Sequence, residues 1–440
     1  MGDDIHVATA TDAVDALSRP QAMRIIQSLG ETGTPPERGV AHINVGNHTY
    51  LDVIRDEYLD MLLPAGGSTF KLVQAYYGGG KTHFLMCLRD LAWASGYASA
   101  YVGLSPSECP FHEPLAVYRA VVKALRAPPP GDEPLLPTTG LPDLLRDLVE
   151  ARRDEHGDRA VRAWLYRTVR NLPVESPSLR NAISEYGLAV LDDDLRKQDV
   201  LAAWLLGEEV PPSSHREVGV FESITKSNAF AMLRGVCQAL KGLEFTGTVL
   251  LFDELDRNLS IGATTRNRTR LTDNLREMVD LCGKSALPGV MVAYAVPPEF
   301  LRNVVPEYPA LQQRLSSPVP LSVTSPQSAL IDLEALDLPP AKLLEAIGAR
   351  ILEVFSIARK RRFDPEVQGR NLRALAEEAS EAQFEVSHRR IFVKSWVALL
   401  TEQALSGETQ IDAVDAGARV MGGAQTLLDA DEEDDGFDDF

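Results

Sequence analysis

The sequence predicts an α/β fold, with a parallel sheet covered by helices on both faces. Three observations lead to this prediction. Short apolar runs alternate with helical patterns along much of the chain. A glycine-rich loop joins the first of these runs to a helix, and a later run ends in two adjacent carboxylates. Because parallel strands must be joined by crossover connections, this alternation favours a parallel sheet.

The composition is that of a folded globular protein with an excess of acid. The 440 residues are 45% hydrophobic and 24% charged, with a net charge of -19, so the chain can bury more than one core. A negative field of this size repels nucleic acid and anionic lipid, so DNA binding would need a local basic surface. Cys87, Cys109, Cys237 and Cys282 have neither disulfide-framework nor zinc-site spacing. With no signal peptide and no apolar membrane span, we expect a cytoplasmic protein without membrane contact.

Residues 1–45 are expected to form a helical N-terminal segment. A helical pattern covers 12–29 and ends at a stretch rich in Gly and Pro. A second helical pattern covers 50–63. This second helix opens the domain that we expect to carry the sheet, residues 46–338.

The expected core domain contains five apolar runs of strand length. These runs are 70–75, 98–104, 248–252, 289–296 and 329–333. A helical pattern over 82–94 follows the first run. The stretch 105–245 carries helical patterns and no strongly apolar strand, so we interpret it as a large helical insertion.

Helical patterns also dominate the sequence after position 339, and they predict a helical lid domain over residues 339–428. The last segment, 429–440, has eight acidic residues and no basic one. Such a segment has little apolar surface to bury, and we expect it to be a disordered acidic tail.

The first motif is Gly78-Gly79-Gly80-Lys81-Thr82, between the first expected strand and its helix. Backbone N–H groups of such a loop can face one anion together, and the helix N-terminus adds its positive dipole end. Lys81 would reach the β- and γ-phosphates of ATP, and the Thr82 hydroxyl would ligate Mg²⁺. Ala75 stands where the full motif has its first glycine. The alternative interpretation is a flexible surface loop.

The second motif is a run of four apolar residues that ends in Asp253 and Glu254. We expect Asp253 to hold Mg²⁺ through water and Glu254 to orient and polarise the attacking water. The alternative is a strand end with solvated acids. A water-activating Glu favours hydrolysis over phosphoryl transfer to a second substrate. Together the motifs indicate a P-loop NTPase of the AAA+/ASCE type, with strand order 5-1-4-3-2, a helical insertion and a C-terminal helical lid.

The end of the fourth expected strand departs from this pattern. AAA+ proteins usually carry a polar sensor there, but Ala295-Val296-Pro297 has no suitable side chain, and Tyr294 is a poor substitute. This departure argues against efficient hydrolysis. It leaves open a nucleotide-binding scaffold that hydrolyses little or nothing.

Two arginines are candidates to complete the site. Arg314 lies between the fourth and fifth expected strands, where an arginine finger directed at a neighbouring subunit often lies, and Arg390 begins a lid helix. We expect Arg314 to be catalytic and Arg390 to contact phosphate, and an ordinary surface arginine is the alternative for each. Tyr77 and His83, on either side of the glycines and Thr82, complete the expected nucleotide contacts.

Two basic clusters are the places where this acidic chain could meet double-stranded DNA. They consist of Arg266, Arg268 and Arg270, and of Arg359, Lys360, Arg361 and Arg362. The alternative for the second cluster is a solvated helix end, because cations are favoured near a helix C-terminus.

Several segments taken together resemble the ATP-binding proteins of BREX phage-defence systems, specifically the shorter D-type class. They are Arg24-Ile-Ile-Gln-Ser-Leu, Val40 to Gly46, Tyr77-Gly-Gly-Gly-Lys-Thr, Phe245-Thr-Gly-Thr-Val-Leu-Leu-Phe-Asp-Glu-Leu and Arg389-Arg-Ile-Phe-Val-Lys. The resemblance implies an AAA+-like ATPase, similar in build to origin-recognition and helicase-loader ATPases. It also implies work inside a multi-protein complex that marks host DNA and blocks phage replication.

We expect the protein to be an ATPase switch of a BREX complex that acts with partner proteins, DNA or both. We also expect that it can form a homo-oligomer. A nucleotide-binding assembly scaffold is one alternative. A helicase-loader or initiator-like ATPase outside defence is another, although the acidic body of the chain disfavours direct binding to an origin.

Overall fold

The structure is a computed structural model that describes residues 17–105, 109–129, 137–253, 265–284, 286–315, 319–336, 338–381 and 388–435. The chain divides into two compact units. Residues 47–336 form one, here called the sheet unit, and residues 1–46 with 337–440 form the other, here called the helical unit. The mixed α/β class predicted from the sequence is confirmed.

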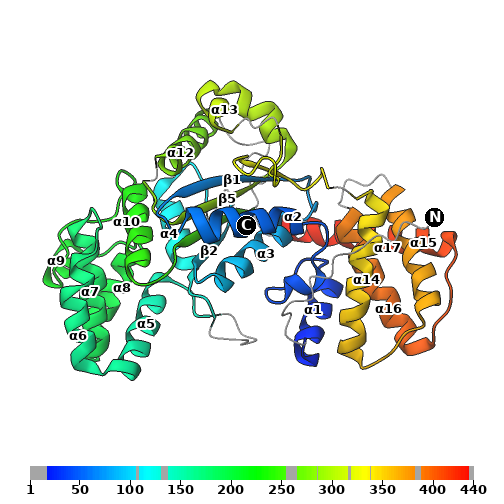
Figure 1. The fold of residues 1–440 in the computed structure, drawn as a ribbon, viewed down its shortest axis with the longest axis horizontal. Coiled ribbons are helices and arrows are strands. Elements are labelled where there is room, and N and C mark those ends of the chain that lie inside the picture. The colour runs from blue at the N-terminus through cyan, green and yellow to red at the C-terminus, as the bar shows by residue number, and fades with distance from the viewer. Residues whose placement is uncertain are drawn as a thin grey trace. The chain divides into compact units, whose positions relative to one another are not determined.

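The sheet unit is built on a six-stranded sheet in the order β3-β2-β4-β5-β1-β6. Figure 1 labels β1, β2 and β5 of this sheet. Its strands are β1 (Ser68–Gln74), β2 (Ala98–Gly103), β3 (Leu125–Arg126), β4 (Thr248–Asp253), β5 (Val290–Val296) and β6 (Leu330–Asp332). β3 is antiparallel to β2, and all other neighbours are parallel. Every residue of β4 and β5 is buried, as is typical of parallel sheets covered on both faces.

Alternate residues of β1 enter two different cores, one on each face of the sheet. Phe70 and Leu72 belong to the larger core, which includes the apolar residues of the helical insertion. Val73 and Ala75 belong to the smaller core, together with apolar residues of α3 (Lys81–Ala94). The glycine-rich loop after β1 therefore connects the sheet to a helix on the side of the smaller core.

Helices make up most of the chain between β2 and β4. They are α4 (Pro114–Ala124), α5 (Leu141–His156), α6 (Asp158–Arg167), η3 (Val169–Asn171), α7 (Pro177–Leu191), α8 (Leu195–Leu205), α9 (Pro212–Glu217) and α10 (Ala229–Gly242). Figure 1 shows α6, α7, α8 and α9 gathered at one end of the sheet unit. The two-residue strand β3 is too short to give a pattern in the sequence.

The segment before β1 is α2 (His48–Val53), which continues directly into η2 (Ile54–Leu62), a π-helix. The wider turn is visible in the hydrogen bond from Leu63 N to Tyr58 O, 3.0 Å long. Tyr58 points to a fully buried lysine of β1, whose Nζ lies 2.6 Å from the Tyr58 hydroxyl and 2.6 Å from Ser328 O. This lysine is Lys71, and burial lowers its pKa to about 7. Its partners are both neutral.

Four further elements complete the sheet unit after β4. They are α12 (Thr265–Gly283), η4 (Phe300–Val304), η5 (Val305–Glu307) and α13 (Pro309–Leu315). After β6 an Asp side chain turns the backbone, because Asp332 Oδ1 accepts from Glu334 N at 3.0 Å. This turn places Glu334 beside the glycine-rich loop.

The helical unit combines both ends of the chain. Its elements are α1 (Arg19–Glu31), η1 (Val40–Ile43), α14 (Pro340–Arg359), α15 (Pro365–Glu381), α16 (His388–Ser406) and α17 (Ala413–Asp435). Ala22, Ile25 and Leu29 of α1 share one buried core with Phe355 of α14 and Trp396 of α16. α1 begins after Ser18, whose side chain forms a capping box with Gln21.

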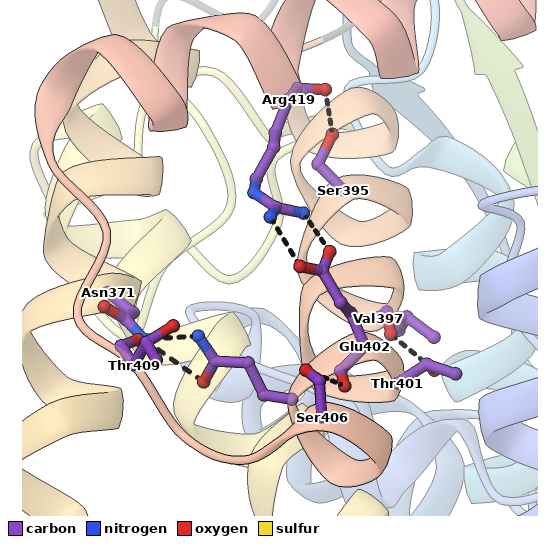
Figure 2. Close-up of polar contacts among 9 residues, drawn as sticks. Asn371, Ser395, Val397, Thr401, Glu402, Ser406, Thr409 and Arg419 are labelled. Atoms are coloured by element: carbon purple, nitrogen blue, oxygen red, sulfur yellow. Dashed lines mark hydrogen bonds and ion pairs between the residues drawn. The ribbon is translucent and has the colours of Figure 1, made fainter.

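A cluster of buried amides joins α15 and α16 to the connection that precedes α17 (Figure 2). Gln368, Asn371 and Gln403 are each at most 2% exposed. Gln403 Oε1 accepts from Gln368 at 2.7 Å, and Asn371 Nδ2 donates to Thr409 O at 2.9 Å. Gln403 Nε2 also donates to Thr409 O at 2.7 Å, and Ile411 N donates to Asn371 Oδ1 at 2.9 Å. The buried amides thus satisfy the backbone of a connection that has no regular structure.

The acidic segment at the C-terminus differs from its expected state. The helical backbone of α17 continues to Asp435, so residues 429–435 are helical where we expected disorder from 429. The reason is local sequence, because 424–435 contain neither Gly nor Pro and include good helix formers. Residues 436–440 lie outside the described residues.

None of the helices in the described part of the chain is both long enough and apolar enough to cross a membrane.

Candidate nucleotide site

The glycine-rich loop lies between the end of β1 at Gln74 and the start of α3 at Lys81. Gly78 has φ +64° and Gly80 has φ +93°, both in the left-handed region that favours glycine. A tight turn closes the loop, because Gly79 N donates to Tyr76 O at 2.9 Å. The local sequence therefore produces a strand, a compact loop and a helix N-terminus, which is an arrangement suited to bind an anion.

Gly79 has a steric role in this loop. A Cβ added there would lie 2.5 Å from Oε1 of Glu334 and 2.8 Å from Cβ of Ala75, so no other residue fits without movement of its neighbours. Ala75 is fully buried, and its methyl group occupies the space beside Gly79. Ala75, which stands at the first glycine position of the motif, therefore fits because Gly79 has no side chain.

Lys81 is only 7% exposed, although it carries a charge. Its Nζ donates to Ala75 O at 3.0 Å and to Tyr76 O at 3.1 Å. Two backbone carbonyls of the loop thus hold the ammonium group at the place where the loop would surround a phosphate.

The two sequence motifs meet at one hydrogen bond. Thr82 Oγ1 donates to Asp253 Oδ2 at 2.6 Å, which joins the first turn of α3 to the carboxyl end of β4. Asp253 is 1% exposed, and the Tyr101 hydroxyl of β2 donates to the same carboxylate oxygen at 2.8 Å. A hydroxyl beside a carboxylate is a donor set that suits Mg²⁺, which binds few protein oxygens together with phosphate and water. Glu254, the expected water-activating residue, lies outside the described residues.

Other expected contacts lie beside the loop. Tyr76 and Tyr77 are each 48% exposed, so both rings can be reached from solvent. His83 lies one turn before Cys87, and its Nε2 is 3.5 Å from the Cys87 sulfur. Burial raises the pKa of the Cys87 thiol, so this cysteine stays a neutral side chain of the core.

The end of β5 is apolar on the face that adjoins the loop. Ala295 belongs to the same small core as Val73 and Ala75. Tyr294 points to the opposite face, where it lies among Phe70, Phe111 and Phe252. Among the described residues its buried hydroxyl has no hydrogen-bond partner. Tyr294 therefore does not provide the missing sensor.

The two expected arginines have other partners. Arg314 on α13 forms a two-pronged ion pair with Asp280 of α12, with Nη2 at 3.2 Å from Oδ2, and it also donates to Ala310 O. These hydrogen bonds join Arg314 to α12 and not to the glycine-rich loop. Arg390 belongs to the helical unit, where its Nε donates to Thr32 O at 2.9 Å.

Both basic clusters are at the surface. Arg266, Arg268 and Arg270 are exposed in the first turns of α12, and Arg359, Lys360 and Arg362 are exposed at the end of α14. Arg361 is different, since it is half-buried and donates to Ala404 O. Lys360 has φ +51°, a left-handed conformation that usually needs glycine at a helix C-terminus.

Two residues of the site were not found from the sequence. Tyr101 is a polar residue in an apolar strand, and the pattern of a single strand does not reveal its partner. Glu334 directly follows the last expected strand, and its Oε1 accepts from Tyr76 N at 3.1 Å. Its place after the carboxyl end of a parallel strand was the available signal, because ligand-binding residues gather at such ends.

Among the comparisons with known proteins, the comparison with protein families gives a match. No curated protein and no solved structure matches this chain. In the described part of the chain, no group of three or more His, Cys, Asp or Glu side chains could hold a metal ion. A family model described as "BREX system ATP-binding protein BrxC/D" matches residues 17–414, which include the loop, Asp253, the whole sheet unit and most of the helical unit. The chain therefore belongs to the BrxC/D family of ATP-binding proteins of the BREX defence system.

Proposed function

We propose that this protein is an AAA+-like P-loop ATPase that works as a nucleotide-driven switch in a BREX complex. The observation that carries the proposal is the hydrogen bond between Thr82 Oγ1 and Asp253 Oδ2. Chance would not bring a Gly-Lys-Thr loop and a buried strand-end carboxylate into contact across so many intervening residues. P-loop ATPases use such a pair to hold Mg²⁺ beside the phosphates.

The arrangement of the sheet supports the same proposal. The parallel strands lie in the order β2-β4-β5-β1-β6. Counted along the chain without β3, this order reads 5-1-4-3-2 from the β6 edge. The strand that leads to the phosphate loop, β1, is then flanked by β6 and β5, and the Asp253 strand β4 lies on the far side of β5. The acid at the end of β4 reaches the loop because both lie at the carboxyl edge of the sheet.

In the proposed site each residue has a distinct task. Backbone N–H groups of Gly78 to Thr82 and the Lys81 ammonium bind the phosphates. Mg²⁺ would neutralise charge that develops on them, held by the Thr82 hydroxyl and, through water, by Asp253. Glu254 orients and polarises the attacking water. Tyr77, His83 and Arg390 are proposed as further nucleotide contacts.

Arg314 is proposed as a finger that acts on the site of a neighbouring subunit. In the isolated chain it is paired with Asp280, so it would have to exchange this partner for a phosphate. This requirement favours a homo-oligomer or another protein as the condition for rapid turnover. An arginine supplied in this way raises hydrolysis rates by about 10³- to 10⁵-fold in other P-loop proteins.

The partners that we propose are other proteins of the defence system, in the cytoplasm, and double-stranded DNA. The exposed arginines 266, 268 and 270 and the exposed cations 359, 360 and 362 are the candidate DNA contacts. In a chain of net charge -19 these clusters provide the local positive potential that phosphate binding needs.

The test is ATP hydrolysis by the purified protein, alone and with duplex DNA, beside Lys81→Ala and Glu254→Gln. We expect turnover that both substitutions abolish, while Glu254→Gln still binds ATP. Turnover that survives Lys81→Ala would falsify the assignment of this loop as the nucleotide site.

A second candidate function is an assembly scaffold that binds ATP and hydrolyses little of it. The observation in its favour is the apolar end of β5, where Ala295 faces the loop side and Tyr294 is buried away from it. Tight ATP binding without turnover in any condition, lost in Lys81→Ala, would favour this scaffold. A helicase-loader or initiator function outside defence has no such observation in its support.

A further inference from the structure

The glycine-rich loop has an acidic neighbour that comes from a distant part of the chain. Glu334 Oε1 lies 3.1 Å from Tyr76 N, and it would lie 2.5 Å from a Cβ at Gly79. The carboxylate therefore touches both the first part of the loop and the glycine just before Gly80. This contact is unusual in a loop proposed to bind phosphates, because it adds negative charge where negative ligands must bind.

The position of Glu334 is built by the fold. Leu333, its fully buried neighbour, donates its N–H to Gln74 O at 2.9 Å, at the end of β1 where the loop begins. Glu334 N itself donates to Asp332 Oδ1 at 3.0 Å. The Tyr50 hydroxyl then holds Asp332 O at 2.9 Å. Three hydrogen bonds thus fix the backbone on which the carboxylate stands.

Among the residues that the structure describes, the Glu334 carboxylate has a weak partner for its charge. Its described hydrogen bond comes from one neutral backbone N–H, and Glu334 is exposed to solvent. Glu334 also makes no ion pair among the described residues, whereas several other glutamates of the chain are paired with Arg or Lys. Its charge therefore remains available to act on a bound anion.

We propose that Glu334 is a specificity-determining residue of the nucleotide site, which lowers affinity for ligands in proportion to their negative charge. The proposal rests on the proposed nucleotide site at this loop. The physical reason is Coulomb repulsion between the carboxylate and phosphates bound at Gly79 to Thr82. Metal-free ATP carries the most charge, whereas ATP with Mg²⁺ and AMP carry less charge, in similar amounts. The residue would thus make the site prefer the magnesium complex to the free nucleotide.

The test is isothermal titration calorimetry on the full chain with Glu334→Gln. The amide keeps the size of the side chain and an oxygen acceptor for Tyr76 N, and it removes only the charge. Glu307→Gln is the matched control, because Glu307 is also exposed in the sheet unit and makes no described hydrogen bond to the loop. Each protein is titrated with ATP in EDTA, ATP with Mg²⁺ and AMP, at low and at high salt.

We expect Glu334→Gln to tighten binding of metal-free ATP by roughly threefold to tenfold at low salt. The gain should be smaller for ATP with Mg²⁺ and for AMP, and reduced for all three ligands at high salt where charges are screened. Glu307→Gln should bind all three ligands like the wild type.

Two kinds of result would overturn the proposal. Unchanged or weaker binding in Glu334→Gln, or a gain of equal size for all three ligands, would show that Glu334 only shapes the loop. If the wild type and both variants fail to bind any nucleotide, the proposed site itself is wrong, and this inference falls with it. Nucleotide binding by the wild type therefore distinguishes a failure of the Glu334 proposal from a failure of the proposed nucleotide site.

Discussion

The Asp253 cluster (Thr82, Tyr101 and Asp253) and the Asn371 cluster (Gln368, Asn371 and Gln403) both bury polar side chains, but they differ in what satisfies them. In the Asp253 cluster, two side-chain hydroxyls donate to one carboxylate oxygen. In the Asn371 cluster, neutral amides bond to each other and to the backbone at 409 and 411, and Gln368 also donates to the Glu408 carboxylate. A backbone partner cannot leave without unfolding its segment, whereas a hydroxyl can turn towards a metal ion.

The difference suggests a way to distinguish a functional polar cluster from a structural one. The Asn371 cluster closes a connection between helices, and every change to it should appear in stability. The Asp253 cluster lies at the edge of the sheet, beside a loop that can bind an anion, and changes to it should appear in ligand binding. Three substitutions test this contrast, beginning with the largest expected effect.

Asn371→Ala should lower the free energy of unfolding by about 2–4 kcal/mol, because it leaves the buried N–H of Ile411 without its acceptor and removes a donor to Thr409 O. Urea denaturation followed by circular dichroism measures the change. The control is Glu402→Gln, which removes the exposed ion pair with Arg419 on the neighbouring helix and should cost less than about 1 kcal/mol. Unchanged stability in Asn371→Ala, or weaker ATP binding by its folded form, would break the contrast.

Asp253→Asn should weaken Mg²⁺-supported ATP binding by roughly 10- to 100-fold, the range typical of groups that hold a metal through an outer shell. The amide keeps an oxygen acceptor for Thr82 and Tyr101, so the fold should persist. Calorimetry across a series of Mg²⁺ concentrations measures the loss. ATP in EDTA is the reference, where the variant should bind at least as tightly as the wild type because it lacks a carboxylate beside the phosphates. An equal loss with and without Mg²⁺ would mean that Asp253 shapes the site and does not hold the metal.

Lys71 sharpens the contrast, because it is a buried ionisable group whose described partners are the Tyr58 hydroxyl and a carbonyl. Burial lowers its pKa from 10.5 to about 7. At pH values between these two, Lys71 is protonated in the unfolded chain and deprotonated in the folded chain. Stability should therefore rise with pH above about 7, by about 1 kcal/mol per unit. Lys71→Met should remove this slope.

The measurement for Lys71 is the difference in unfolding free energy between wild type and Lys71→Met at several pH values from about 7 to 8.5. Both proteins contain the same cysteines, so the ionisation of unfolded thiols cancels in this difference. A difference that stays constant with pH would show that the lysine remains charged in the folded protein.

The sequence predicted the sheet well, since each of the five expected runs overlaps one of the parallel strands found in the structure. Buried parallel strands are continuous apolar runs, and this pattern needs no knowledge of their neighbours. β3 was missed because a two-residue strand has no period. The π-helix over 54–62 was missed because it has only about two turns. Over that length the spacing of its apolar residues does not differ clearly from the spacing in an α-helix.

For the candidate site, the sequence identified the residues that a motif contains and missed those that only the fold brings together. Lys81, Thr82 and Asp253 belong to two local patterns, and the structure joins them. Tyr101 and Glu334 come from other strands, and only strand order places them beside Asp253 and the loop. The partner of Arg314 could not be predicted either, because Asp280 is one of many acidic residues in the sequence.

The place of β1 in the sheet has a consequence for how the protein is made. β1 lies between β5 and β6, and both of these strands come far later in the sequence. While the ribosome is still producing the helical insertion, the strand that carries the glycine-rich loop has no strand to pair with. A nascent chain that ends before Val290 thus holds the whole loop and Asp253 but lacks both strands that flank β1. The ability to hold a nucleotide is acquired late in synthesis, and until then the apolar strand β1 is a segment that chaperones can recognise.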